Sequence, residues 1–217
     1  MTQPGERSPN LPEPPSAGAR RRPHSPAAPL FVWLVLQMAV LVLAAQRVPL
    51  SARFPLEAEK LAVHEMLVVQ IAPSAMLFPW LLRDRITTLL VALSAILFVH
   101  LAAHLAGVPH TRAAVAAAYV AGWLIGLALW RPVLEHGRAR MIGVAIATSL
   151  SIGGAVLAYL RAETSPTTTP HSFGPILGAL AQLDGTAGVR SWAFLIAFLA
   201  TSLVASLITR RATRAIA

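Results

Sequence analysis

The chain has 217 residues and no cysteine, is 56% apolar and is only 12% charged, whereas a soluble domain usually carries about 25% charged residues. This composition excludes an ordinary soluble domain, and the lack of cysteine excludes disulfides, thiolate metal sites and thiol catalysis. The net charge of +9 would suit a nucleic-acid-binding protein, but the arginines lie between apolar blocks, where they set the topology of membrane helices. We therefore expect a membrane protein with no nucleic-acid partner.

The beginning of the chain, residues 1–28, is rich in proline and contains Arg20, Arg21 and Arg22. Such a stretch cannot bury a core and is predicted to be a disordered cytoplasmic tail. The apolar block that follows, from about Leu30 to Ala45, is longer than the apolar part of most signal peptides, and no convincing A-x-A cleavage site follows it. It is predicted to be a retained first membrane helix.

Five further apolar blocks are long enough to cross a bilayer, which takes about 17–25 residues. They run from about residues 61 to 82, 86 to 107, 113 to 130, 141 to 160 and 192 to 208. The fold class is therefore predicted to be all-α, a polytopic bundle of about six transmembrane helices over residues 29–210, followed by a cytoplasmic tail, 211–217. The long outer loop, 161–191, contains an apolar segment from Phe173 to Leu183 that is too short to span. We expect this segment to lie on the outer membrane surface or to cap the bundle.

The distribution of basic residues orients the predicted helices. With the N-terminus inside, twelve of the eighteen Lys and Arg residues fall on the cytoplasmic side and six on the outer side, as the positive-inside rule requires. Both termini are therefore predicted to be cytoplasmic. The inner turn Arg83-Asp84-Arg85 is interpreted as a topology anchor with a local ion pair, and Pro132 is expected to stop the fourth helix.

Small residues at four-residue spacing predict close helix contacts. Gly122 and Gly126 form a G-x-x-x-G step on the fourth predicted helix, and Ser149 and Gly153 form a similar step on the fifth. In lipid, small residues allow two helix backbones to approach. The pattern favours ordinary helix packing over a dedicated dimer face.

Four ionisable residues are predicted to lie near the outer ends of the second and third helices: His64, Glu65, His100 and His104. Such groups are costly in a membrane unless they face the bundle interior or a wet cavity. His100 and His104 share one helix face, with about 40° between them, and could bind one metal ion through two imidazoles. Met66 and Met38 could add thioethers that favour Cu(I). The alternative is that the histidines are interfacial polar residues and that His64 and Glu65 only pin helices together.

Signatures of catalysis are not found. There is no phosphate-binding loop, no H-E-x-x-H zinc motif and no nucleophile elbow in the sequence. We therefore expect that the protein is not an enzyme.

Several segments match, in the same order, the motifs of one family of membrane proteins. The stretch His64-Glu65-Met66-Leu67-Val68-Val69-Gln70-Ile71-Ala72-Pro73 resembles the family's Q-H-M-L-L-x-x-x-A-P helix, and Phe98-Val99-His100-Leu101 is similar to its W-x-W-H-L segment. The end of the fourth helix, from Gly126 to Leu134, resembles G-L-L-F-W-W-P-V-L. Ala187-Gly188-Val189-Arg190-Ser191-Trp192 looks like the end of the family's D-Q-Q-L-A-G-L-I-M-W segment, with Asp184 close to its acidic position. In these segments the chain resembles the CtaG family of assembly factors for caa(3)-type cytochrome c oxidase. Among the family's histidines, only His100 carries over cleanly, so the chain resembles a divergent member.

The resemblance implies a multi-pass protein of the bacterial inner membrane that assists oxidase assembly, with copper handling at the outer face by His64, Glu65, His100 and His104. Its expected partners are membrane lipid and cytochrome c oxidase subunits. Two alternatives remain open. The chain could be a small multipass transporter or permease subunit, with Pro73 and Pro79 breaking the second helix to shape a substrate site, or a helical scaffold whose polar residues only lock packing.

Overall fold

The computed structural model of the protein describes residues 27–51, 57–134, 137–164 and 174–216. Within these ranges, helix is the only regular secondary structure, which confirms the predicted all-α class. The predicted N-terminal tail falls outside the described residues up to residue 26, and so does the 165–173 part of the outer loop.

Seven α-helices and one short 3₁₀ helix make up the described part of the chain. In order they are α1 (Ala27–Ser51), α2 (Glu57–Leu81), α3 (Arg85–Leu105), α4 (His110–Leu129), the 3₁₀ helix η1 (Arg131–Leu134), α5 (Gly137–Thr164), α6 (Pro175–Asp184) and α7 (Val189–Ile216). The fourth helix ends just before Pro132, as the sequence predicted. The last helix runs on through the predicted C-terminal tail as far as Ile216.

Five of these helices, α2, α3, α4, α5 and α7, are long and apolar enough to cross a membrane. A helix suits this role because it satisfies every backbone N–H and C=O group within its own segment, where no water is available to do so. The apolar stretch described for α1, Ala27–Leu43, is shorter. The chain is therefore a helical membrane bundle, and α1 as a sixth crossing stays a prediction.

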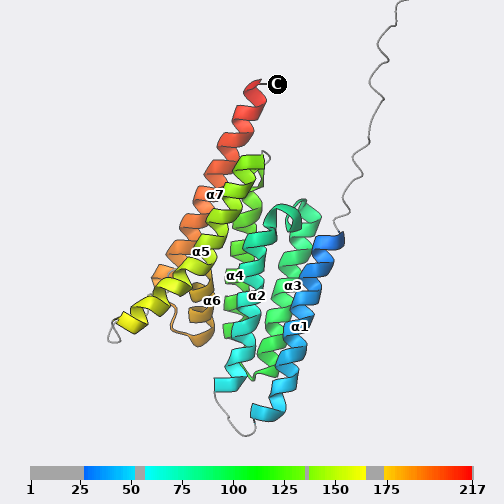
Figure 1. The fold of residues 1–217 in the computed structure, drawn as a ribbon, viewed down its shortest axis with the longest axis vertical. Coiled ribbons are helices and arrows are strands. Elements are labelled where there is room, and N and C mark those ends of the chain that lie inside the picture. Colours follow the sequence, from blue (N-terminus) through cyan, green and yellow to red (C-terminus); the bar gives the residue numbers. More distant parts are fainter. Residues whose placement is uncertain (1–26, 52–56, 135–136, 165–173, 217) are drawn as a thin grey trace, which may run out of the picture.

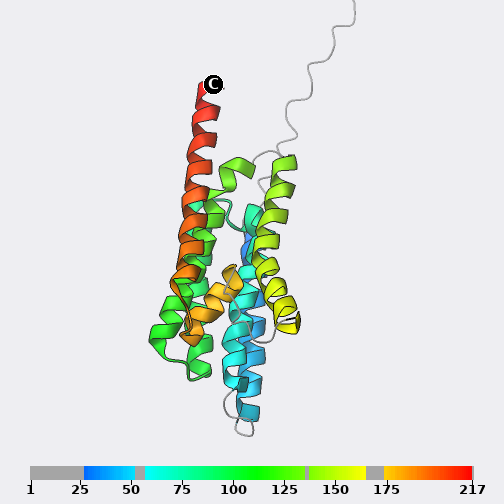
Figure 2. The ribbon, with the colours of Figure 1, turned by 90° about the vertical axis from the view of Figure 1, so that its left-hand side faces the viewer.

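The long helices lie side by side and alternate in direction along the chain (Figure 1). We name the two ends of the bundle by their residues. The arginine end carries the turn from Arg83 to Arg85, η1 and the last turns of α7, and the histidine end carries His64, His104 and His110. The first turn of α1 and the end of α7 both lie toward the arginine end (Figures 1 and 2).

The core of the bundle is formed mainly by α2, α3 and α4. Between 44% and 50% of the apolar part of each of these helices is buried, compared with only 17% for α5 and 22% for α7. The largest fully buried side chains include Trp33, Phe78, Tyr119 and Trp123. Most of the apolar surface of α5 and α7 therefore faces outward, as expected for helices in contact with lipid.

A polar layer joins α1 to α2 and α3 near the middle of the bundle. Nε2 of Gln70 donates to Oε1 of Gln37 at 2.9 Å and to the carbonyl oxygen of Ala95 at 3.0 Å, and both glutamines are fully buried. One turn away, Nε1 of Trp33 donates to Oγ of Ser94 at 3.0 Å. Hydrogen bonds between helices are retained in lipid because no water competes for them, so this layer fixes α1 against its neighbours.

The two prolines of the second helix do not break it. Helix α2 continues from Glu57 to Leu81 through Pro73 and Pro79, so the broken helix considered in the sequence analysis is wrong. Prolines are tolerated in membrane helices where neighbouring helices and local side chains compensate for the lost hydrogen bond. In addition, the hydroxyl of the buried Ser74, next to Pro73, donates to the carbonyl oxygen of Ile71 at 2.8 Å within the helix, so it is not left unpaired.

The G-x-x-x-G step on α4 brings this helix against α7. A Cβ atom on Gly122 would lie 3.0 Å from a methyl group of Leu195, and one on Gly126 would overlap the ring of Phe198. The Phe198 ring is stacked on Trp123, with centroids 4.5 Å apart, and lies against Trp130. The predicted packing role of the step is confirmed. By contrast, nothing in the described residues lies within 4 Å of a Cβ on Gly153.

Replacing Gly126 by alanine tests this close approach. Alanine favours a helix by about 1 kcal/mol over glycine, but at Gly126 the new methyl group meets a ring held between two tryptophans, and overpacking costs about 1–3 kcal/mol. We expect Gly126→Ala to lower the thermal midpoint in detergent and Gly153→Ala, which meets no neighbour, to raise it or leave it unchanged. Equal effects of the two substitutions would show that α4 and α7 are not packed through Gly126.

Asp84 forms the N-terminal cap of α3 at the arginine end. Its carboxylate accepts hydrogen bonds from the backbone N–H and the hydroxyl of Thr87, both at 2.7 Å. The bond from the Thr87 N–H is the main cause that holds the pKa of Asp84 below its usual value, and the Thr87 hydroxyl and Arg131 act in the same direction. The local ion pair expected in this turn is not found among the described residues; the carboxylate binds the start of the helix instead.

We expect Asp84→Ala to destabilise the folded protein by about 1 kcal/mol, the usual cost of removing a cap. Because the pKa of Asp84 is lowered by folding, its contribution is present above the unfolded pKa, about 3.9, and is lost as the pH falls through the folded value. Unfolding in detergent, followed between pH 6 and pH 3, should show the wild type losing stability relative to Asp84→Ala as the pH falls. A constant difference over this range would contradict the cap.

Candidate functional site at the histidine end

Helix α6 fills the bundle at the histidine end. It packs against α4, α5, α2 and α7, and Ile176, Ala179 and Leu183 are buried. Figure 2 shows α6, in orange, between α7 and α5 and beside α2. Of the two placements predicted for this apolar segment, the membrane surface is therefore wrong, because its side chains are enclosed by the bundle.

The sequence fixes where α6 begins and how closely it approaches α4. Pro175 occupies the first turn, where its missing N–H is not needed. Gly178 lies directly beneath the hydroxyl group of Tyr119, so a Cβ atom at this position would overlap it. Glycine at this place lets the short helix come into contact with α4.

The end of α6 is capped by Gly185 and Arg112. Gly185 has φ +72°, in the left-handed region that favours glycine, and its N–H donates back toward the carbonyl oxygens of Ala181 and Gln182. The guanidinium of Arg112, from the start of α4, lies over this glycine and donates to the carbonyl oxygen of Asp184 at 3.5 Å. A cation at the C-terminal end of a helix is favoured by the helix dipole.

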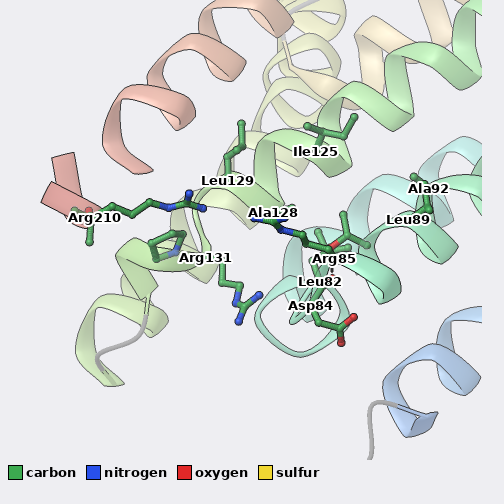
Figure 3. Close-up of a pocket in the computed structure, with 13 residues that line it drawn as sticks. Leu82, Asp84, Arg85, Leu89, Ala92, Ile125, Ala128, Leu129, Arg131 and Arg210 are labelled. Carbon is green, nitrogen blue, oxygen red and sulfur yellow. Dashed lines mark hydrogen bonds between the residues drawn. The ribbon is translucent and has the colours of Figure 1, made fainter. Parts of the chain in front are cut away.

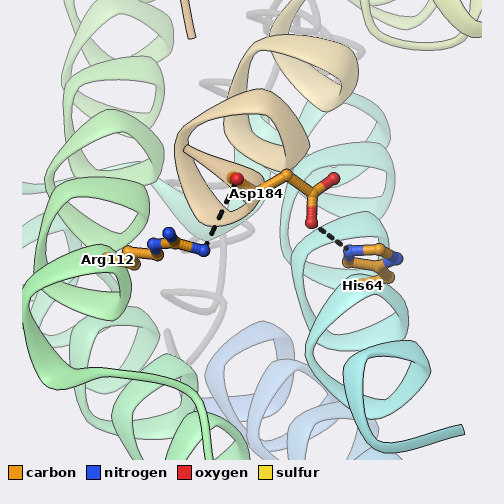
Figure 4. Close-up of polar contacts among 3 residues, drawn as sticks. All are labelled: His64, Arg112 and Asp184. Carbon is orange, nitrogen blue, oxygen red and sulfur yellow. Dashed lines mark hydrogen bonds and ion pairs between the residues drawn. The ribbon is translucent and has the colours of Figure 1, made fainter. Parts of the chain in front are cut away.

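This cap directs the side chain of Asp184 toward α2. Oδ1 of Asp184 lies 3.6 Å from Nε2 of His64, and the two side chains are 35% and 30% exposed. In Figure 4, Asp184 lies between Arg112 on one side and His64 on the other. The separation is long for a direct hydrogen bond but suits an ion pair when the imidazole is protonated. Asp184, at the end of α6, therefore contacts both His64 of α2 and Arg112 of α4.

A buried hydrogen-bonded cluster of Tyr119, Gln182 and Ser191 holds the end of α6 in place. Nε2 of Gln182 donates to Oγ of Ser191 at 3.1 Å, and the hydroxyl of Tyr119 donates to the carbonyl oxygen of Ser191 at 3.2 Å. The ring of Tyr119 also meets that of Trp192 edge-on, with centroids 5.6 Å apart. These contacts tie α4, the end of α6 and the start of α7 together, so the position of Asp184 is well defined.

The other predicted ligands lie nearby in different surroundings. Nδ1 of His100 lies 2.9 Å from the carbonyl oxygen of Ile96 on its own helix. His104 is exposed and its ring stacks on that of His110, the first residue of α4, with centroids 6.1 Å apart. Glu65 is half-buried next to His64. The structure thus forms two pairs, His64 with Asp184 and His104 with His110.

In the described part of the chain, no three His, Asp or Glu side chains are grouped closely enough to hold a metal ion. The four predicted ligands His64, Glu65, His100 and His104 thus do not form a closed site there, and their metal role stays a prediction. The residues present provide pairs of ligands, which is fewer than the three or four protein ligands of a resident zinc site.

Sequence reasoning missed Arg112, Tyr119 and Gln182, because their partners are far away in the chain. Tyr119 and Ser191, for example, are separated by 72 positions, and no local pattern links them. Asp184 was reached only through the resemblance to a family motif. A signal that could have indicated this site is the pair Gly185 and Asp184 at the end of a short apolar segment, which is typical of a capped helix.

Comparisons of the chain with protein-family models, with curated proteins and with solved structures give no match.

The contact between His64 and Asp184 can be measured with a double-mutant cycle. Because both side chains are about one-third exposed, we expect a coupling energy of about 0.2–1 kcal/mol from the unfolding of wild type, His64→Ala, Asp184→Ala and the double variant. The matched cycle with His104→Ala and Asp184→Ala should give no coupling, since His104 contacts His110. Equal coupling in the two cycles would mean that Asp184 does not pair with His64.

Proposed function

We propose that the protein is a multi-pass protein of the bacterial inner membrane that assists the assembly of a cytochrome c oxidase through its histidine end. The observation that carries the proposal is the contact between His64 and Asp184. It joins two of the segments that resemble the CtaG family, the His64 segment of α2 and the segment that begins near Asp184 at the end of α6. We propose an accessory role and no catalysis.

The surroundings of this contact also support the proposal. The rest of the Asp184 segment, Ala187 to Trp192, follows α6, and its Ser191 accepts hydrogen bonds from Gln182 and Tyr119. Segments that are distant in the sequence thus contribute to one polar region at the end of the bundle. This is the arrangement expected if the resemblance reflects a shared site and not only shared membrane composition.

The proposed orientation has the histidine end outside the cytoplasm. Twelve of the eighteen Lys and Arg residues belong to the opposite side, and a cytoplasmic excess of basic residues is the rule for membrane proteins. The first turn of α1 and the end of α7 then both lie on the cytoplasmic side, as the alternation of the helices requires (Figure 1).

We propose that the protein binds copper only to pass it on, and not as a permanent cofactor. His64, Glu65, His100 and His104 are the candidate ligands, and imidazole is a suitable ligand for copper. Within the described residues these ligands do not belong to any group of three that could enclose a metal ion, so a bound copper ion would keep coordination positions open, and an ion that must be passed on needs such positions. The copper version of the proposal therefore concerns transient binding at the outer surface.

The structure removes one argument for a transporter or permease subunit. That argument relied on a second helix broken at Pro73 and Pro79, and α2 is continuous through both residues. A helical scaffold without further function is distinguished from the proposal by the following experiment.

Deletion of the gene in its host should reduce cytochrome c oxidase activity in isolated membranes severalfold, because assembly of the oxidase is impaired. The wild-type gene and an Arg83→Ala control at the other end should restore this activity. The variants His64→Ala with Asp184→Ala, and His100→Ala with His104→Ala, should restore it poorly, and copper added to the medium should partly compensate. Purified protein should bind about one Cu(I), with at least about tenfold weaker affinity in the His100→Ala/His104→Ala variant.

Normal oxidase activity in the deletion strain would contradict the assembly role. The orientation is tested in the same host with single cysteines, which the natural chain lacks. An impermeant thiol reagent should label Thr111→Cys on intact cells and should not label Arg83→Cys. The reverse labelling would place the histidine end in the cytoplasm.

A further inference from the structure

A second candidate site lies at the opposite end of the bundle. A cavity of about 760 Å³ opens between the turn that precedes α3, the facing sides of α3 and α4, and the end of α7. Figure 3 shows its lining residues. Its volume is within the range of about 300–1,000 Å³ that is usual for ligand pockets.

The mouth of this pocket is strongly basic. Arg85, Arg131 and Arg210 line it, and Arg85 and Arg210 point into the space from opposite sides in Figure 3. Within the described residues, no hydrogen bond or close ion pair of Arg85 or Arg210 is found, whereas Arg131 interacts electrostatically with Asp84. The carboxylate of Asp84, which also lines the pocket, already accepts two hydrogen bonds from Thr87.

The wall of the pocket on the side away from the arginines is apolar, and it is continuous with the exposed apolar surface of the bundle. It includes Leu89 and Ile125, which are 59% and 48% exposed. On α3 the same exposed surface extends along Ile86, Leu90 and Leu93. Since this surface belongs to a helix that can span the membrane, the pocket opens toward lipid.

We propose that this pocket binds an anionic phospholipid of the surrounding membrane. Its phosphate would lie between Arg85 and Arg210, close to Arg131, and one acyl chain would follow Leu89 and Ile125 into the lipid. Arginine binds phosphate through several N–H donors at once, and basic pockets between membrane helices are suited to phospholipid head groups. The inference does not depend on the proposed function.

Other occupants fit the pocket less well. A free phosphate ion would gain nothing from the apolar wall, whereas a phospholipid matches both parts of the site. A second copy of the chain would have to supply carboxylates to this mouth. The chain has only nine Asp and Glu residues against eighteen Lys and Arg residues, so its own surface is a poor complement.

The test uses the full chain purified in a neutral detergent, with bound lipid measured by native mass spectrometry. We expect phosphatidylglycerol to bind in preference to phosphatidylcholine with the same acyl chains. Arg85→Gln with Arg210→Gln should weaken phosphatidylglycerol binding at least about tenfold, since both substitutions remove charged hydrogen-bond donors to the phosphate. The matched control, Arg83→Gln with Arg211→Gln, removes equal charge from the neighbouring exposed positions and should bind as the wild type does.

A third variant keeps all the arginines and fills the apolar wall. Ala92→Phe, at a residue that lines the pocket, should also weaken binding, and it remains informative if the double arginine variant does not fold. Equal loss in the control variant would show general attraction to surface charge and overturn the site. Competition by millimolar inorganic phosphate, unchanged binding to Ala92→Phe, or an Arg85- and Arg210-dependent dimer would also overturn a lipid occupant.

Discussion

A polar group inside a membrane has no water to bind, and this constraint shapes the interior of the bundle. The amide of Gln70 meets it by donating to both Gln37 and the backbone of Ala95. Two amide atoms of this layer, Nε2 of Gln37 and Oε1 of Gln70, have no partner among the described residues, and an unpaired buried group costs about 1–3 kcal/mol. The layer therefore adds little net stability. Its effect is to select one position of α1 against α2 and α3, because any other register would leave more of these groups unpaired.

The same constraint separates what the sequence could predict from what it could not. Hydropathy and the positions of arginine predicted the long helices, since a spanning helix must be apolar over its whole length. Pro132 predicted the end of α4 for a local reason. The place of α6 was beyond such reasoning, because its burial depends on contacts of Gly178 with Tyr119 and of Gly185 with Arg112. The capping role of Asp84 was also missed, although an aspartate just before an apolar block is itself a local sign of a cap.

The two ends of the bundle are built in different ways. At the histidine end, α6 fills the space between the long helices, and one aspartate receives contacts from two of them. At the arginine end, the helices diverge around an open basic pocket. The sequence predicted that His64 lies near one end of the second helix, as in α2, but it did not indicate the contact with Asp184, because the two residues are 120 positions apart in the chain. One end is thus closed by protein, and the other is open to molecules from the membrane.

The length of α7 has a further consequence. This helix has 28 residues, which corresponds to about 42 Å at about 1.5 Å per residue, whereas the hydrocarbon layer is about 30 Å thick. The additional length is charged, since Arg190 lies in the first turn of α7 and Arg210 and Arg211 lie near its end, so these turns extend beyond the hydrocarbon layer. Arg210 therefore lies at the level of the lipid head groups. The basic mouth of the pocket then faces the layer of the membrane in which the phosphates of the lipids lie.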